Sequence, residues 1–280
     1  MKSKMIRATV LGSDVSRSRS PHIHNAAFAA LGLQGLYDAV SVTAPNFRKT
    51  VRGLFAEGHR YVNVTIPHKR HAANLADKRS AAVDMTGAAN TLVRRDNGEL
   101  FADNTDGDGI LRALELLDAK VNRKSRVLLI GAGGAAAGAL LAFAQAGAEI
   151  TLLARRVAQA SALKRRLPES LRTRVKVATL DATRLEKALA EVDTVVSAVP
   201  AAAWEDAALA GAFAAMKRNT AVVEMAYGKT TPLSLAVKAR TKRYQDGLPM
   251  LVFQAAAAIK VALGKMPPTK PLFDAVARAG

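Results

Sequence analysis

Residues 127–136 read VLLIGAGGAA and give the clearest indication of the fold. The first four of these residues are all apolar, as expected of a strand that is buried on both faces. In the turn that follows, Gly131 permits a tight bend, and Gly133 carries no side chain where a pyrophosphate would approach the backbone. Ala136 is small where a helix must pack on the strand. The pattern is typical of a Rossmann-type dinucleotide-binding unit.

The residues around this stretch support the same interpretation. A helix is expected from the turn to Ala146, and its N-terminus would offer free N–H groups and a positive dipole end to a phosphate. A second apolar strand is expected at 150–153, which makes a glycine-rich turn without a ligand the weaker alternative. We therefore predict that the turn binds the cofactor through Gly131, Ala132, Gly133, Gly134 and Ala135.

The end of the second strand indicates which dinucleotide binds. NAD-binding units usually place a carboxylate there to hold the ribose 2′-hydroxyl. This strand instead ends Ala154-Arg155-Arg156, without a carboxylate nearby. Two guanidinium groups suit a 2′-phosphate, so Arg155 and Arg156 predict NADP(H). The alternative is that both arginines are merely solvated.

Along the rest of the sequence, short apolar runs alternate with helical patterns, which is typical of α/β folds with mostly parallel sheets. Ser20 is expected as the N-cap of a helix that has Pro21 at its first position. The expected strands are 6–11, 36–42, 61–66, 127–130, 150–153, 175–178, 194–198 and 221–225, with a hairpin of 89–94 and 99–102. The expected helices begin at Ser20 and Lys69 or span 46–57, 106–117 and 250–263, and another follows Pro271.

Length and composition exclude several classes of protein. With 280 residues, half of them hydrophobic, the chain is long enough for two domains. It has no cysteine, and we expect neither a signal peptide nor a membrane span, as in a cytoplasmic protein. The net charge of +18 is scattered and aromatic residues make up only 5%. We therefore expect a basic solvated surface and not a nucleic-acid platform.

Four polar motifs stand out in the first half of the chain. They are S-R-S-P at 18–21, N-V-T-I-P-H-K at 63–69, A-N-T at 89–91 and N-T-D-G at 104–107. Each lies at the end of an expected strand or the start of an expected helix, where side chains point into a crevice. Together with the glycine turn, D-G-L at 246–248 and Gln254, they resemble the shikimate dehydrogenase family over nearly the whole chain.

This resemblance implies a reversible, NADPH-dependent reduction of 3-dehydroshikimate to shikimate, a step towards chorismate and the aromatic amino acids. Lys69 and Asp106 would be the catalytic pair. The substrate, a small polyhydroxylated acid, would be bound by Ser18, Ser20, Thr65, Asn90, Tyr227 and Gln254. The nicotinamide side of NADP(H) would be contacted by Met225, Gly247 and Met250.

The chemistry of these side chains agrees with the resemblance. Hydride addition to a ketone places negative charge on oxygen, and an ammonium can stabilise that charge and supply the proton. Lys69 could instead be a surface lysine, but a positive charge at a helix start opposes the helix dipole. Asp106 could simply cap the helix that it begins. The five histidines lack the partners of a metal site or a catalytic triad, and we predict no metal.

The resemblance also gives two domains. Residues 1–105 with 247–280 would bind the substrate, and residues 106–246 would form the dinucleotide-binding domain. The cofactor half departs from the family at Ala137, Ala154, Ser197–Pro200 and Glu224–Thr231, which leaves open a paralogue acting on quinate or an aminoshikimate. A non-catalytic nucleotide-binding regulatory protein is the alternative from another class, against which the intact Lys69 and Asp106 argue. A monomer and a homodimer are both compatible with the sequence.

Overall fold

The computed structural model describes residues 5–279, which form two compact units. Unit 1 takes in the described residues up to Gly109 and those from Leu251 onward, and unit 2 is Ile110–Met250. The chain passes between the units twice, inside α5 (Asp106–Glu115) and inside α12 (Leu248–Leu263). Each unit contains one six-stranded sheet, so the predicted α/β fold class is confirmed.

The sheet of unit 1 is mixed and has the order β2-β1-β3-β5-β6-β4. β1 is parallel to β2 and β3, and β4 is parallel to β6, whereas β5 is antiparallel to both neighbours. Its strands are β1 (Ile6–Gly12), β2 (Gly35–Ser41), β3 (Tyr61–Val64), β4 (Lys78–Arg79), β5 (Thr91–Arg94) and β6 (Leu100–Asp103). Its other helices are α1 (Ser20–Ala30), α2 (Phe47–Ala56), α3 (Lys69–Leu75), α4 (Ala81–Thr86) and α13 (Thr269–Arg278).

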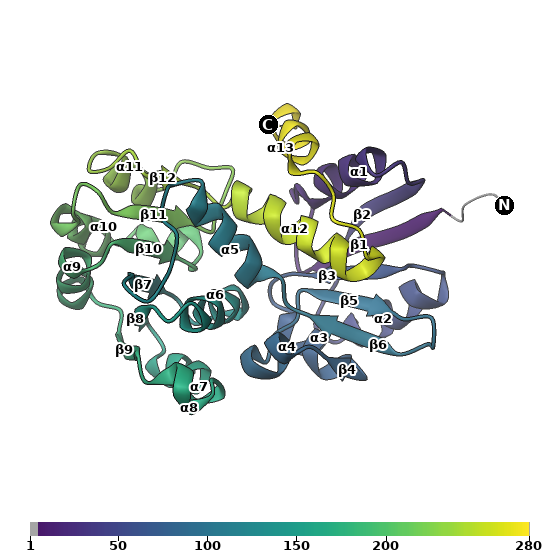
Figure 1. The fold of residues 1–280 in the computed structure, drawn as a ribbon, viewed down its shortest axis with the longest axis horizontal. Helices are drawn as coiled ribbons and strands as arrows, with labels where there is room; N and C mark the ends of the chain where they lie inside the picture. The colour runs from purple at the N-terminus through teal and green to yellow at the C-terminus, as the bar shows by residue number, and fades with distance from the viewer. Residues whose placement is uncertain (1–4, 280) are drawn as a thin grey trace. The chain divides into compact units, whose positions relative to one another are not determined.

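The helices of unit 1 bury the apolar faces that the sequence gives them. Phe47, Val51 and Phe55 lie at helical spacing along α2 and join one buried cluster with sheet residues such as Val62 and Leu92. α1 contacts β2 and also α13, which comes from the other end of the chain (Figure 1). Helices from both ends of the sequence therefore pack together in unit 1.

The sheet of unit 2 is entirely parallel and has the order β12-β11-β10-β7-β8-β9. Its strands are β7 (Arg126–Ile130), β8 (Glu149–Ala154), β9 (Val175–Thr179), β10 (Thr194–Ser197), β11 (Ala221–Glu224) and β12 (Tyr244–Gln245). This is the strand order of dinucleotide-binding folds, in which the chain reverses direction across the sheet between the first and fourth strands. Here those strands are β7 and β10, and ligands of such folds bind beyond their carboxyl ends.

Helices and 3₁₀ turns surround this sheet (Figure 1). They are α6 (Gly134–Gln145), α7 (Val157–Arg166), α8 (Glu169–Arg172), α9 (Ala182–Glu191), η1 (Ala201–Trp204), α10 (Ala207–Gly211), η2 (Ala212–Ala215) and α11 (Pro232–Lys238). Trp204 and Phe213 anchor a core with Leu189 of α9 and Leu233 of α11. None of the helices within residues 5–279 is long and apolar enough to cross a membrane.

Two local predictions are wrong. Ser20 is not an N-cap: α1 begins at Ser20 itself, because the hydroxyl of Ser18 accepts a hydrogen bond from the Ser20 N–H at 3.2 Å and starts the turn earlier. The strand expected at 61–66 ends at Val64, since Thr65 and His68 close a turn through a backbone hydrogen bond of 2.9 Å.

Candidate active site

Lys69 and Asp106 form a shielded ion pair in unit 1. Lys69 is the first residue of α3 and Asp106 is the first residue of α5. Lys69 Nζ donates to Asp106 Oδ2 at 2.5 Å, with the side chains 12% and 4% exposed. Lys69 is therefore no ordinary surface lysine. Its position depends on Asp106, because a charge removed from water needs a partner.

The second oxygen of Asp106 is also held. Asn90 Nδ2 donates to Asp106 Oδ1 at 2.9 Å and lies 3.1 Å from Gln254 Oε1. Asn104 Oδ1 accepts from the Asp106 N–H at 3.1 Å, so Asn104 bonds the start of α5 and leaves the Asp106 carboxylate to its two partners. The structure thus brings together four predicted site residues from distant parts of the chain.

One residue of this cluster had no role in the sequence analysis. Thr105 donates its backbone N–H to Asn90 Oδ1 at 3.0 Å, and its hydroxyl donates to the Gln254 carbonyl at 2.9 Å. Thr105 therefore fixes which way the Asn90 amide faces and ties α12 to the cluster. The only available signal was its place inside the N-T-D-G motif.

Ser18, Ser20 and Thr65 come from other segments of unit 1. Ser18 lies in the loop after β1 and accepts a hydrogen bond from the backbone N–H of Ser20, the first residue of α1. Thr65 follows β3, and its backbone N–H donates to the Leu11 carbonyl at 2.8 Å, which sets its loop against the end of β1. These residues thus follow the carboxyl ends of two neighbouring parallel strands, β1 and β3. Tyr227 lies in unit 2 and is half-buried.

The glycine turn of unit 2 has the geometry that a dinucleotide requires. Gly131 has a φ of +114°, and a Cβ there would lie 2.9 Å from the Ala198 carbonyl oxygen, where β7 and β10 end side by side. Gly133 precedes α6 and faces open space, since a Cβ would meet no atom within 4 Å. A phosphate could therefore approach the backbone at Gly133, and α6 has twelve residues behind its N-terminus.

Gln159 is a further contributor that the sequence analysis missed. Its side-chain amide, on α7, donates to the Ala132 carbonyl at 2.8 Å and so pins the glycine turn. Arg155 and Arg156 follow the end of β8 with exposed side chains, Arg156 as the residue before α7. The open turn and the two exposed guanidinium groups together fit a dinucleotide with a 2′-phosphate.

Gly247 and Met225 are in close contact, and Met250, which follows them in α12, is buried. The Gly247 N–H donates to the Ala226 carbonyl at 3.0 Å. A Cβ at Gly247 would lie 2.1 Å from the Met225 carbonyl oxygen, so only glycine fits without a backbone shift. The segment after β11 therefore depends on residue 247 being glycine.

Gly247→Ala should accordingly destabilise the protein by about 3 kcal/mol, as expected for an overpacked site that must move its backbone. Thermal unfolding measures the effect, and NADPH affinity should fall with it if residue 225 lies near the cofactor. Gly211→Ala is the control in the same unit, because a Cβ at Gly211 meets nothing within 4 Å and its φ is ordinary. Equal melting temperatures for the two variants would contradict the packing argument.

Glu224 ends β11 as a carboxyl group that is only 1% exposed. Its Oε2 accepts from Thr231 Oγ1 at 2.8 Å and from the Tyr244 hydroxyl at 2.9 Å. Its Oε1 has no hydrogen-bond partner among the described residues. Burial therefore raises the pKa of Glu224 above its ordinary value of 4.5, and the two hydroxyl donors offset only part of that shift.

This shift predicts a pH-dependent stability. The folded state holds the Glu224 proton more tightly than the unfolded chain, so stability from this group is lost as the pH rises above 4.5. Glu224→Gln removes the titration, so its melting temperature relative to the wild type should rise between about pH 4 and about pH 8. The exposed Glu205→Gln is measured in parallel, as the same substitution at a surface position of the same unit. A difference that stays constant with pH for Glu224→Gln would rule out the raised pKa.

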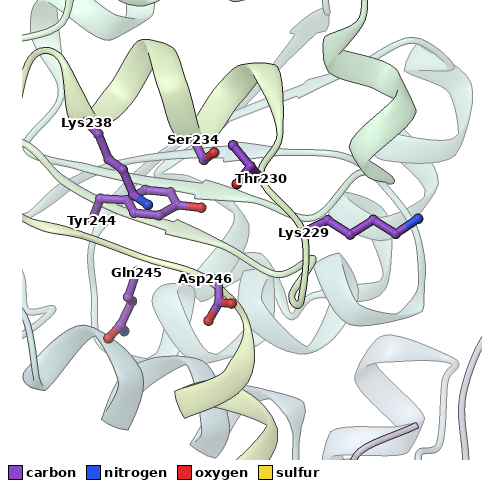
Figure 2. Close-up of a pocket in the computed structure, with 7 residues that line it drawn as sticks. All are labelled: Lys229, Thr230, Ser234, Lys238, Tyr244, Gln245 and Asp246. Atoms are coloured by element: carbon purple, nitrogen blue, oxygen red, sulfur yellow. The ribbon is translucent and has the colours of Figure 1, made fainter. Parts of the chain in front are cut away.

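A shallow pocket of about 310 Å³ lies beside this segment of unit 2 (Figure 2). In Figure 2, Lys238 lies against the ring of Tyr244, and its Nζ is 5.1 Å from the ring centroid. The pocket is lined by Lys229, Thr230, Ser234, Lys238, Tyr244, Gln245 and Asp246. None of these seven is a predicted site residue, so the pocket is not the predicted substrate site.

Comparisons with known proteins match both units. The family model described as "Shikimate dehydrogenase substrate binding domain" matches residues 10–92. The model described as "Alanine dehydrogenase/PNT, C-terminal domain" matches residues 111–233. Fold and site thus define a two-domain α/β protein that joins a substrate-binding domain to a Rossmann-type domain.

Individual relatives define the family. The shikimate dehydrogenase (NADP(+)) of Acinetobacter baumannii is 33% identical over 261 residues, or 93% of this chain and 97% of the relative. The shikimate dehydrogenase structure from Mycobacterium tuberculosis is 33% identical with a TM-score of 0.85, covering 98% of this chain and 99% of that one. The structure from Thermus thermophilus in complex with NADP(H) and shikimate is 29% identical with a TM-score of 0.81, covering 99% and 100%. The chain belongs to the shikimate dehydrogenase family.

Proposed function

We propose that this protein is an NADP-dependent shikimate dehydrogenase that reversibly reduces 3-dehydroshikimate to shikimate in the synthesis of chorismate and the aromatic amino acids. The observation that carries the proposal is the shielded Lys69–Asp106 pair, held by Asn90 in a member of this family. The relatives named for NADP(+), or solved with NADP(H) and shikimate, support the cofactor and the substrate.

Lys69 supplies the proton and stabilises the negative charge. An ammonium has three N–H donors, and the structure commits one of them to Asp106 Oδ2. The others are available for the ketone oxygen of the substrate, which becomes a hydroxyl when it takes a proton from Nζ. In the oxidative direction, neutral Nζ takes the hydroxyl proton back.

Asp106 fixes the lysine and helps to bind the substrate. Its carboxylate accepts a hydrogen bond from the Lys69 ammonium and so orients it, and its remaining lone pairs can accept a hydrogen bond from a ring hydroxyl. Asn90 and Gln254 are bonded to each other beside it and offer amide groups for other hydroxyls. A small polyhydroxylated acid needs such partners, because each unpaired buried polar group costs about 1–3 kcal/mol.

NADPH, when bound, supplies the hydride. The residues proposed to hold it are the turn at 131–135, with the pyrophosphate against Gly133 and α6, and Arg155 and Arg156 for the 2′-phosphate. Met225, Gly247 and Met250 are proposed for the nicotinamide side. We further propose that residues 1–105 with 247–280 bind the substrate and residues 106–246 the dinucleotide.

The test of substrate class measures NADP⁺ reduction with shikimate and with quinate in parallel. The proposal expects kcat/KM for shikimate to exceed that for quinate by at least about 10-fold, as expected when one ring substituent fits poorly. The reverse ratio would move the protein to the quinate branch of the family. Absence of turnover with both acids, despite NADP⁺ binding, would favour a non-catalytic nucleotide-binding protein.

The other predicted properties stay predictions. They are a cytoplasmic location, a monomer or homodimer, and the absence of nucleic-acid and membrane partners. Size-exclusion chromatography with light scattering distinguishes the two oligomeric states.

A further inference from the structure

A chain of buried hydrogen bonds leads from the interior of unit 1 to the Lys69–Asp106 pair. The Tyr37 hydroxyl donates to Asn63 Oδ1 at 2.8 Å, and Asn63 Nδ2 donates to Thr91 Oγ1 at 3.0 Å. Thr91 Oγ1 donates to Asn90 Oδ1 at 3.0 Å, and Asn90 donates to Asp106. The four residues before Asp106 are each less than 10% exposed. Asn63 and Thr91 lie in two of the conspicuous sequence motifs, although neither has a role in the proposed function.

Two backbone groups determine the directions of these hydrogen bonds. The Thr105 N–H can only donate, so the atom of Asn90 that it meets is Oδ1, and Nδ2 must face Asp106. The backbone carbonyl of Asn90 can only accept a hydrogen bond, so the Asn63 side-chain atom 3.2 Å from it is Nδ2. Asn63 Oδ1 therefore faces Tyr37, whose hydroxyl must donate. All four donors point the same way, towards the Asp106 carboxylate.

Tyr37, the first donor in this series of hydrogen bonds, is held rigidly. The Tyr37 backbone N–H and carbonyl both bond to the Asn25 side chain, each at 2.9 Å. The Tyr37 ring stacks on His24 with a centroid distance of 3.9 Å and an interplanar angle of 6°. Burial lowers the pKa of His24 to about 3 and raises that of Tyr37 well above 10, so His24 stays neutral and Tyr37 keeps the proton that it donates.

Strand register explains how this series of hydrogen bonds crosses the sheet. Asn63 of β3 and Thr91 of β5 are a direct cross-strand pair. Tyr37 on β2 reaches Asn63 across β1, where Ala8 is its partner on the intervening strand. Polar residues at these buried positions would weaken the core if they were unpaired, yet here they are joined to one another and end at a carboxylate.

We propose that Tyr37, Asn63 and Thr91 are positioning residues for catalysis, which polarise and orient the Asn90 amide and through it hold Asp106 and Lys69. Hydrogen bonds aligned in one direction strengthen one another in a low-dielectric interior, and a terminal carboxylate gains most from them. The inference rests on the proposed function, because it assigns these residues to the same reaction.

Thr91 gives the sharpest test, since one substitution keeps its shape and another keeps its hydroxyl. Thr91→Val should lower kcat about tenfold, the loss expected for one buried hydrogen bond that acts on a charged group. Thr91→Ser should stay within about twofold of the wild type, although it loses a buried methyl. NADPH affinity should be unchanged in both. The matched control is Thr9→Val on β1, because the Thr9 hydroxyl is buried and, within residues 5–279, bonds only to the Asp38 carbonyl.

The side-chain amide resonances of Asn90 give a readout that does not need turnover. They should shift in Thr91→Val and stay in place in Thr91→Ser and Thr9→Val. If the wild type turns over neither acid, the proposed function fails. The resonances would still show whether the hydrogen bonds from Tyr37 to Thr91 polarise the Asn90 amide. Equal losses of kcat in Thr91→Val and Thr91→Ser, or unmoved resonances in Thr91→Val, would overturn the inference.

A substitution of Tyr37 tests the hydrogen bond that lies farthest from Asp106. Tyr37→Phe keeps the ring stacked on His24 and removes the first donor, so kcat should fall about threefold to fivefold. Tyr61→Phe is the control, because Tyr61 is as buried and its hydroxyl bonds to His24 Nδ1 at 2.7 Å, outside the chain. Tyr61→Phe should alter the melting temperature and leave kcat unchanged. Equal kcat values for the two variants would mean that the hydrogen bond of Tyr37 contributes to core packing and not to catalysis.

Discussion

Lys69→Ala is expected to lower kcat for 3-dehydroshikimate reduction by about three orders of magnitude, the combined loss of a positioned proton donor and of its charge. NADPH should still bind with its normal affinity, because the residues proposed to hold it lie in unit 2. Stopped-flow measurement of a single turnover separates the chemical step from product release.

The substitution also leaves Asp106 without its cation, and a buried unpaired charge is destabilising. Lys69→Met keeps most of the apolar stem and should show the same loss of kcat, and thermal unfolding shows whether each variant is folded in the assay. Lys49→Ala, on the exposed face of α2, is the control and should retain full activity. A kcat within tenfold of the wild type in both Lys69 variants would remove this residue from the chemistry.

Arg155→Asp is expected to reverse the preference between NADPH and NADH. A guanidinium that binds the 2′-phosphate contributes a charge-assisted hydrogen bond, and a carboxylate in its place repels the phosphate and can accept from a 2′-hydroxyl. The ratio of kcat/KM for NADPH to that for NADH should fall about 100-fold or more. Nearly all of the change should appear in KM for the cofactor.

Arg166→Asp separates this effect from general electrostatics. Arg166 is an exposed arginine at the end of α7 in the same unit, so the substitution makes the same change in net charge. Its cofactor preference should stay that of the wild type. If Arg155→Asp and Arg166→Asp behave alike, the 2′-phosphate is bound elsewhere, and Arg156 is the next candidate.

The fold was largely predictable because its strands are short apolar runs between clear turn signals. The βα unit at 127–146 shows this best, since the positions of its glycines follow from backbone geometry. The helices between 157 and 215 were less accessible. In α7, for example, only Ala160 is buried, so the sequence has no apolar stripe there. The two-residue strands β4 and β12 carry too few residues for any periodicity.

The candidate site was predictable where polar motifs lie at strand ends. Lys69 and Asp106 were expected to be paired, and the structure places them in contact. The series of hydrogen bonds from Tyr37 to Asp106 was not predictable. Tyr37 resembles any aromatic residue of a strand, and its hydrogen bond to Asn63 crosses β1. Contacts between strands that are distant in sequence depend on register, which single residues do not reveal. The roles of the predicted site residues stay predictions.

The proposed reaction is measured by following NADPH absorbance when the purified protein is mixed with 3-dehydroshikimate at neutral pH, with NADH and 3-dehydroquinate in parallel. We expect rapid loss of NADPH with 3-dehydroshikimate, shikimate as the product, and much slower reaction in the other combinations. Loss only with 3-dehydroquinate, or no loss with any pair although NADPH binds, would contradict the proposed reaction.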